Sequence, residues 1–183
     1  MNNIRKIRIH ILSLAFTASL FSLASCNDDH NHDEGEVITT VQLLFSDSAT
    51  GATLGDFRFE DKDGPGGNNP SRLDTIYLDS GKAADVSLRF ADVSSGTSKD
   101  ITAEIRAEAD QHIVCFKSAG VQLGITVTDS DGKYPIGLET RWKPGTAGNG
   151  TITVVLKHQP GSKNGSCDPG DTDVEVSFPL QIR

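Results

Sequence analysis

Two histidines and several acids stand close together near the start of the chain. The run NDDHNHDEGE contains His30, His32 and Asp33, with further acids on both sides. Zn²⁺ and Cu²⁺ both accept imidazole nitrogens and carboxylate oxygens as ligands, so this run is a candidate site for either metal. The alternative is a solvated acidic segment in which the histidines are incidental, because so polar a run buries too little apolar surface to fold by itself.

His112 and His158 are candidate ligands outside this run. His158 ends an alternating apolar segment, residues 152–158, and His112 opens the segment that contains Cys115. Each imidazole therefore stands at the end of an expected strand, as a structural side chain or as a ligand for a metal or haem. We favour the structural role, and we expect the two imidazoles to approach each other if Cys115 and Cys167 do.

Two short segments begin like calcium-binding loops, DKDG at residues 61–64 and DSDG at residues 129–132. Carboxylates at alternate positions followed by glycine suit a calcium loop. Pro65 and Lys133 occupy the positions of the next ligand, and neither segment has the closing glutamate of an EF-hand. The pattern therefore favours ordinary turns.

The sequence carries no HExxH, GxSxG or glycine-rich phosphate-binding motif, so we expect no enzyme activity. The net charge is −8 at pH 7. An acidic balance of this kind repels phosphate backbones, which argues against nucleic acid as a partner.

The chain begins like a secreted protein. The basic start MNNIRKIR precedes a mostly apolar segment, residues 9–24, that is diluted by serine and threonine. A membrane-spanning helix needs about 20 predominantly apolar residues, and this segment is shorter. We therefore predict a signal peptide at residues 1–25, an acidic tether at residues 26–36 and a folded domain at residues 37–183.

The junction Leu23-Ala24-Ser25-Cys26 resembles the lipobox of bacterial lipoproteins, in which cleavage precedes a cysteine that is then acylated. This resemblance implies lipidation of Cys26, and two or more acyl chains hold a protein stably on a membrane. The acids that follow resemble the export signals of Bacteroidota lipoproteins displayed on the outer face of the outer membrane. We expect a lipid-anchored, surface-exposed protein; the alternative is an ordinary secretory peptide with an incidental cysteine.

Cys115 and Cys167 are the two remaining cysteines, and they would lie in a compartment where disulfides persist. A bond between them would stabilise the domain by about 4 kcal/mol on the chain-entropy model. The alternative is a buried thiol at Cys115 and a loop thiol at Cys167.

The elements that position these residues are mainly strands, because apolar and polar residues alternate along most of the chain after residue 36. Segments rich in glycine, proline, asparagine and aspartate separate the alternating runs. Residues 101–109 favour a short helix, and Pro179 predicts an edge or a bulge in the last strand. The pattern predicts an all-β, antiparallel, immunoglobulin-like β-sandwich of about nine strands with one short helix. The expected inward residues are Val37, Val41, Leu43, Phe45, Phe57, Phe59, Val86, Leu88, Phe90, Val121, Leu123, Ile125, Val127, Ile136, Leu138, Trp142, Ile152, Val154, Leu156, Val174, Val176, Phe178, Leu180 and Ile182.

The domain resembles a family of small Bacteroidota surface lipoproteins encoded near TonB-dependent receptors. The resemblance rests on EVITTVQLLF, FEDKDGPGG, DITAEIRAEADQHIVCF, TDSDGKYPIGLE, VVLKHQPGSK and DTDVEVSF. Some members carry a label that implies a type 1 periplasmic-binding fold. That fold alternates helices with parallel strands, whereas this sequence predicts one helix.

These observations together predict a non-catalytic outer-membrane surface lipoprotein. Its expected role is to capture or present a ligand, such as a metal, haem or another small molecule, to a TonB-dependent receptor. The sequence establishes no cofactor for this role, and Zn²⁺ or Cu²⁺ is the candidate ion. The alternative is a structural or adhesive surface lipoprotein without a small ligand.

Overall fold

A computed structural model describes residues 37–64 and 66–183. The predicted signal peptide and tether, with Cys26, His30, His32 and Asp33, lie outside these residues. The described chain forms strands and one short helix: β1 (Thr40–Asp47), β2 (Thr53–Glu60), β3 (Arg72–Leu73), β4 (Ile76–Leu78), β5 (Ala84–Asp92), β6 (Lys99–Asp100), α1 (Thr102–Ala107), β7 (His112–Ala119), β8 (Leu123–Val127), β9 (Glu139–Pro144), β10 (Gly148–His158) and β11 (Asp171–Ile182).

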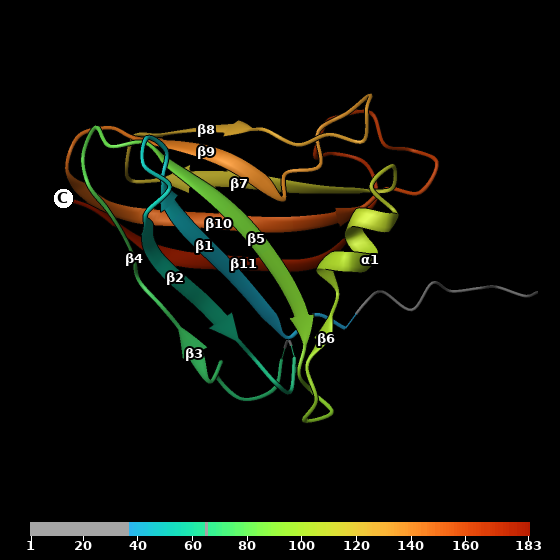
Figure 1. The fold of residues 1–183 in the computed structure, drawn as a ribbon. Coiled ribbons are helices and arrows are strands. Elements are labelled where there is room, and N and C mark those ends of the chain that lie inside the picture. The colour runs from blue at the N-terminus through green and yellow to red at the C-terminus, as the bar shows by residue number, and fades with distance from the viewer. Residues whose placement is uncertain (1–36, 65) are drawn as a thin grey trace, which may run out of the picture. The chain divides into compact units, whose positions relative to one another are not determined.

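The strands form two sheets that face each other (Figure 1). One sheet has the order β3-β2-β1-β5-β9-β8, with β6 paired to β5, and the other has the order β4-β11-β10-β7. Neighbouring strands are antiparallel except for β4 and β11, which run parallel. The predicted all-β sandwich with one short helix is therefore confirmed. The two strands beyond the predicted nine are β3 and β6, which are too short to show alternation.

The core lies between the sheets and follows the predicted alternation. Side chains from β1, β5, β10 and β11 interdigitate there in one buried cluster. Trp142 of β9 is fully buried, and its ring meets the ring of Phe45 edge-on at 5.1 Å. Val37 is an exception, because it is 59% exposed and precedes the first residue of β1. Burial starts instead with Ile38.

Helix α1 coincides with the predicted helical segment and leads into β7. Ile101 and Ile105 are buried against the core, so the apolar stripe of the helix faces the sheets. The hydroxyl of Thr102 accepts a hydrogen bond from the Phe90 N–H at 2.9 Å and donates one to the Phe90 carbonyl. These bonds fix α1 to β5 and thereby set where β7 begins.

The sequence predicts an edge or a bulge at Pro179, and in the structure this residue pairs with β10 alone. Its strand, β11, is internal to the four-stranded sheet, but β4 pairs only with residues 180–182. Proline has no N–H to donate, so it fits a position with a paired strand on one side only.

Candidate metal site

His112 and His158 are brought together by the pairing of β7 with β10. They are direct partners in the antiparallel register, with His112 opening β7 and His158 ending β10. Their rings are stacked, with centroids 4.6 Å apart and planes inclined by 10°. The expected approach of the two imidazoles is therefore present in the structure.

The orientation of His112 is fixed by its own backbone surroundings. Its Nδ1 lies 3.2 Å from the carbonyl oxygen of Glu108, in the turn between α1 and β7. A carbonyl can only accept, so Nδ1 carries the hydrogen and a neutral ring keeps its lone pair on Nε2. Histidines that bind metals commonly donate their second ring nitrogen to a backbone carbonyl in this way.

Asp173 of β11 approaches His112 of β7, although β10 lies between these two strands in the sheet. Leu156 pairs with Val174 and Lys157 pairs with Thr172, so Asp173 is the extra residue of a β-bulge in β11. Bulges redirect side chains out of the regular alternation. The Asp173 side chain is 6% exposed, and its Oδ2 lies 3.9 Å from Nε2 of His112.

The electrostatic environment of Asp173 is unusual for a carboxylate. Among the described residues, its Oδ2 has no hydrogen-bond partner. Burial raises the pKa of Asp173, and the nearby imidazoles of His112 and His158 act in the opposite direction. A positive charge between these groups would compensate for the loss of water around the carboxylate.

Glu108 contributes a second carboxylate to the cluster. One ligand atom each from Glu108, His112 and His158 lie within 4.8 Å of one another. The sequence did not single out Glu108 or Asp173, because neither follows the apolar alternation that located the histidines. Their positions depend on the turn after α1 and on the bulge.

Two imidazoles and a carboxylate form a ligand set that Zn²⁺ and Cu²⁺ accept, with a further position left for water or another ligand. Tetrahedral zinc separates its ligand atoms by roughly 3.3 Å, given metal–ligand bonds near 2 Å. A metal lies in the plane of each imidazole that binds it. One of the two stacked rings must therefore rotate when an ion binds, and His158 is the more exposed of the two.

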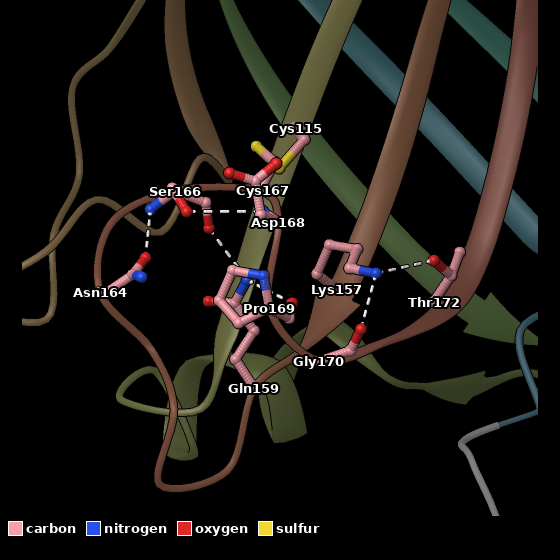
Figure 2. Close-up of a disulfide and its surroundings, with 10 residues drawn as sticks. All are labelled: Cys115, Lys157, Gln159, Asn164, Ser166, Cys167, Asp168, Pro169, Gly170 and Thr172. Carbon is pink, nitrogen blue, oxygen red and sulfur yellow. Dashed lines mark hydrogen bonds between the residues drawn. A yellow bond between two sulfur atoms is a disulfide. The ribbon is translucent and has the colours of Figure 1, made fainter.

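A disulfide holds the loop that follows His158. Cys115 of β7 and Cys167 are bonded, with their Cα atoms 6.2 Å apart, as the sequence favoured. Figure 2 shows Gln159 reaching into this loop, where its side-chain amide donates to the carbonyls of Ser166 and Pro169. The loop after β10 is thus held by hydrogen bonds within itself and by the disulfide to β7. These connections limit how far the His158 backbone can move.

The two segments that begin like calcium loops form turns in the structure. Asp129 accepts hydrogen bonds from the Gly137 and Leu138 N–H groups. Asp131 accepts from Tyr134 and, through Oδ2, from the Lys163 ammonium at 2.8 Å. These carboxylates are occupied by donors of the chain itself, which agrees with the interpretation as turns.

Asp63 plays a similar part in the first of these segments. Its carboxylate accepts from the backbone and side-chain N–H groups of Asn68. Asp61 differs from the other three aspartates, because it has a buried oxygen, Oδ1, without a hydrogen-bond partner among the described residues.

Comparison with protein-family models, with curated proteins and with solved structures finds no match for this chain. Within the part of the chain that the structure describes, no helix is both long and apolar enough to span a membrane.

Proposed function

We propose that the sandwich is a metal-capturing module that binds Zn²⁺ or Cu²⁺ through His112 and His158. The main support for this proposal is that two imidazoles on paired strands lie beside the buried carboxylate of Asp173. His112 is held by the Glu108 carbonyl with Nε2 toward Asp173. An ion in this cluster would be bound by two nitrogens and one carboxylate, from Asp173 or Glu108.

The module acts, in this proposal, at the cell surface. The lipobox-like junction at Cys26 supports a lipid anchor, and the acids after it support display on the outer membrane. Captured metal would then be presented to a TonB-dependent receptor, a partner that rests on the family resemblance alone. The protein performs no catalysis in this role.

The test is calorimetric titration of Zn²⁺ and Cu²⁺ into the full lipidated chain in detergent, after treatment with a chelator. We expect His158→Ala to weaken binding by more than about tenfold, since losing even a hydrogen-bond partner of a ligand costs about 10- to 100-fold. Binding should also weaken as the pH falls, because a protonated imidazole has no lone pair for the metal.

The matched control is the double variant His30→Ala, His32→Ala, which removes two imidazoles from the predicted tether. It should bind as the unmodified chain does if the site lies in the sandwich. Loss of binding in this control with full binding by His158→Ala would place the site in the tether. Absence of binding by the unmodified chain would contradict the proposal.

A further inference from the structure

We infer that the open end of the sandwich contains a second site, which binds a small organic ammonium ion. A cavity of about 530 Å³ lies there, where the segment before β1, the end of β2 and the start of β11 meet. Its walls therefore come from both sheets. The inference shares Asp173 with the metal proposal but does not rest on it, because its central residue, Asp61, is not among the proposed metal ligands.

Asp61 is the principal observation. It lines the cavity, is only 8% exposed, and its Oδ1 is buried without a hydrogen-bond partner among the described residues. Its backbone is fixed by an N–H donated to the Thr39 carbonyl at 2.8 Å. A buried carboxylate oxygen without a donor is costly for a folded protein unless a ligand supplies one.

Asp173 supplies a second carboxylate to the same cavity from the opposite sheet. It also lines the cavity, and its buried Oδ2 likewise has no partner among the described residues. Burial is the main cause that raises the pKa of Asp61. Two buried carboxylates that line the same cavity favour a ligand with a positive charge and several N–H donors.

The other residues that line the cavity determine which kind of cation fits. Ile38, Phe59 and Val174 give the cavity an apolar lining. Its volume lies in the range of sites for small organic molecules, roughly 300–1,000 Å³, and is far larger than a bare metal ion needs. An ammonium group on an apolar body of several carbons matches both the acids and the walls.

A lysine at the rim does not neutralise the acids. Lys62 lines the cavity, but its side chain is 63% exposed and its ammonium lies 3.4 Å from Glu60. The cavity therefore keeps a negative character.

The test uses phenethylammonium as the probe and its neutral analogue 2-phenylethanol as the comparison. Binding to the full chain in detergent is measured by saturation-transfer NMR and titration at pH 7.5. We expect the ammonium to bind and the alcohol to bind at least about tenfold more weakly, the loss expected for one charged hydrogen bond.

Variants separate this site from the metal site. Asp61→Asn should weaken phenethylammonium binding about tenfold or more and leave Zn²⁺ binding unchanged. Asp56→Asn removes the same charge from an exposed position on β2 and should leave probe binding unchanged. His158→Ala should weaken Zn²⁺ binding by more than about tenfold and keep probe binding.

Folding of the Asp61→Asn variant is checked by its thermal midpoint, which should stay close to that of the unmodified chain because the asparagine side chain keeps an oxygen that can accept from the Asp63 and Gly64 N–H groups. Three results would overturn the inference: equal binding of the alcohol and the ammonium, unchanged ammonium binding by Asp61→Asn, or Ca²⁺ binding at Asp61 without any binding of the ammonium.

Discussion

Lys163 and Asp131 form an ion pair with almost no contact with solvent. Their side chains are 2% and 8% exposed, and Nζ lies 2.8 Å from Oδ2. The ammonium also donates to the Ala109 carbonyl, so the pair ties the loop after β10 to the turn after α1. Breaking such a pair leaves the remaining charge buried and uncompensated, which is why single substitutions there are harmful.

The pair predicts a specific pH dependence of stability. The hydrogen bond from Lys163, together with those from the Tyr134 and Lys133 N–H groups, lowers the pKa of Asp131 from 3.8 to about 2. A carboxyl whose pKa is lower in the folded state stabilises the fold when it is ionised. This contribution is complete above the unfolded pKa and is lost as the pH falls through the folded one.

We therefore expect Asp131→Asn to unfold at lower denaturant than the unmodified chain at pH 7. The difference should shrink as the pH falls from about 4 towards 2. Urea unfolding at both ends of this range is the measurement, with Asp110→Asn, an exposed neighbour of the same region, as the control. A difference that stays constant with pH would show that the charge of Asp131 does not stabilise the fold.

At the scale of the elements, β7 depends on few connections. It lies at the end of its sheet and pairs only with β10 among the named strands. The disulfide from Cys115 to Cys167 joins it to the loop that follows β10, and the Gln159 N–H donates to the Gln111 carbonyl just before β7. The disulfide is therefore placed to preserve the alignment of His112 with His158.

Removing that disulfide should affect both stability and metal binding. The double variant Cys115→Ala, Cys167→Ala should lower the free energy of unfolding by up to about 4 kcal/mol on the chain-entropy model. Urea unfolding measures this, and the unmodified chain in reductant should show a similar loss. Zn²⁺ titration of the folded double variant should show weaker binding. A loss of less than about 1 kcal/mol would mean that the loop is held by its hydrogen bonds alone.

The same elements show how far the sequence predicts this fold. Alternation predicts strands such as β10 because each buried residue is followed by one that faces outward. It cannot predict the two-residue β3 and β6, or the parallel pairing of β4 with β11, since a pairing partner leaves no mark on periodicity. The bulge at Asp173 is hidden for a related reason: an extra residue is recognised only against the register of the neighbouring strand.

The residues of the candidate sites are likewise only partly predictable from the sequence. His112 and His158 are found from the sequence because imidazoles at strand ends are conspicuous there. Asp61 belongs to a segment that the sequence predicts to be a turn. The prediction is correct for Asp63, whose carboxylate accepts a hydrogen bond from the Asn68 N–H. The burial of Asp61 depends on the packing of two sheets around the cavity, and local sequence does not determine this.

At the scale of the whole molecule, the sandwich buries one core between two sheets and carries its two candidate sites close to one end. Asp173 contributes to both, through its approach to His112 and through the cavity that it lines. The arrangement supports the proposed binding role. The proposed lipid anchor would keep such a module at the cell surface.

The anchor has a direct test at this scale. We expect Cys26→Ala to release the protein from membranes or to leave its precursor uncut, because the acyl chains of a lipoprotein are attached to that cysteine. Labelling of growing cells with a fatty acid, followed by separation of membranes, is the measurement. Cys167→Ala, which keeps Cys26, serves as the control and should retain the label. An unmodified protein that takes up no fatty acid would contradict the lipoprotein proposal.

Strand β11 places Asp173 and Arg183 far apart. Extended backbone rises about 3.3 Å per residue, so the stretch from Asp173 to Ile182 spans about 30 Å. The far end is fastened by Arg183, which donates its N–H to the Leu78 carbonyl and lies over the Tyr77 ring. A fluorophore attached after Arg183 would therefore leave the cavity unobstructed, yet stay within range for resonance energy transfer to a fluorescent ligand bound there. The length of β11 would then set the distance between the two fluorophores, so that energy transfer reports ligand occupancy of the cavity on living cells.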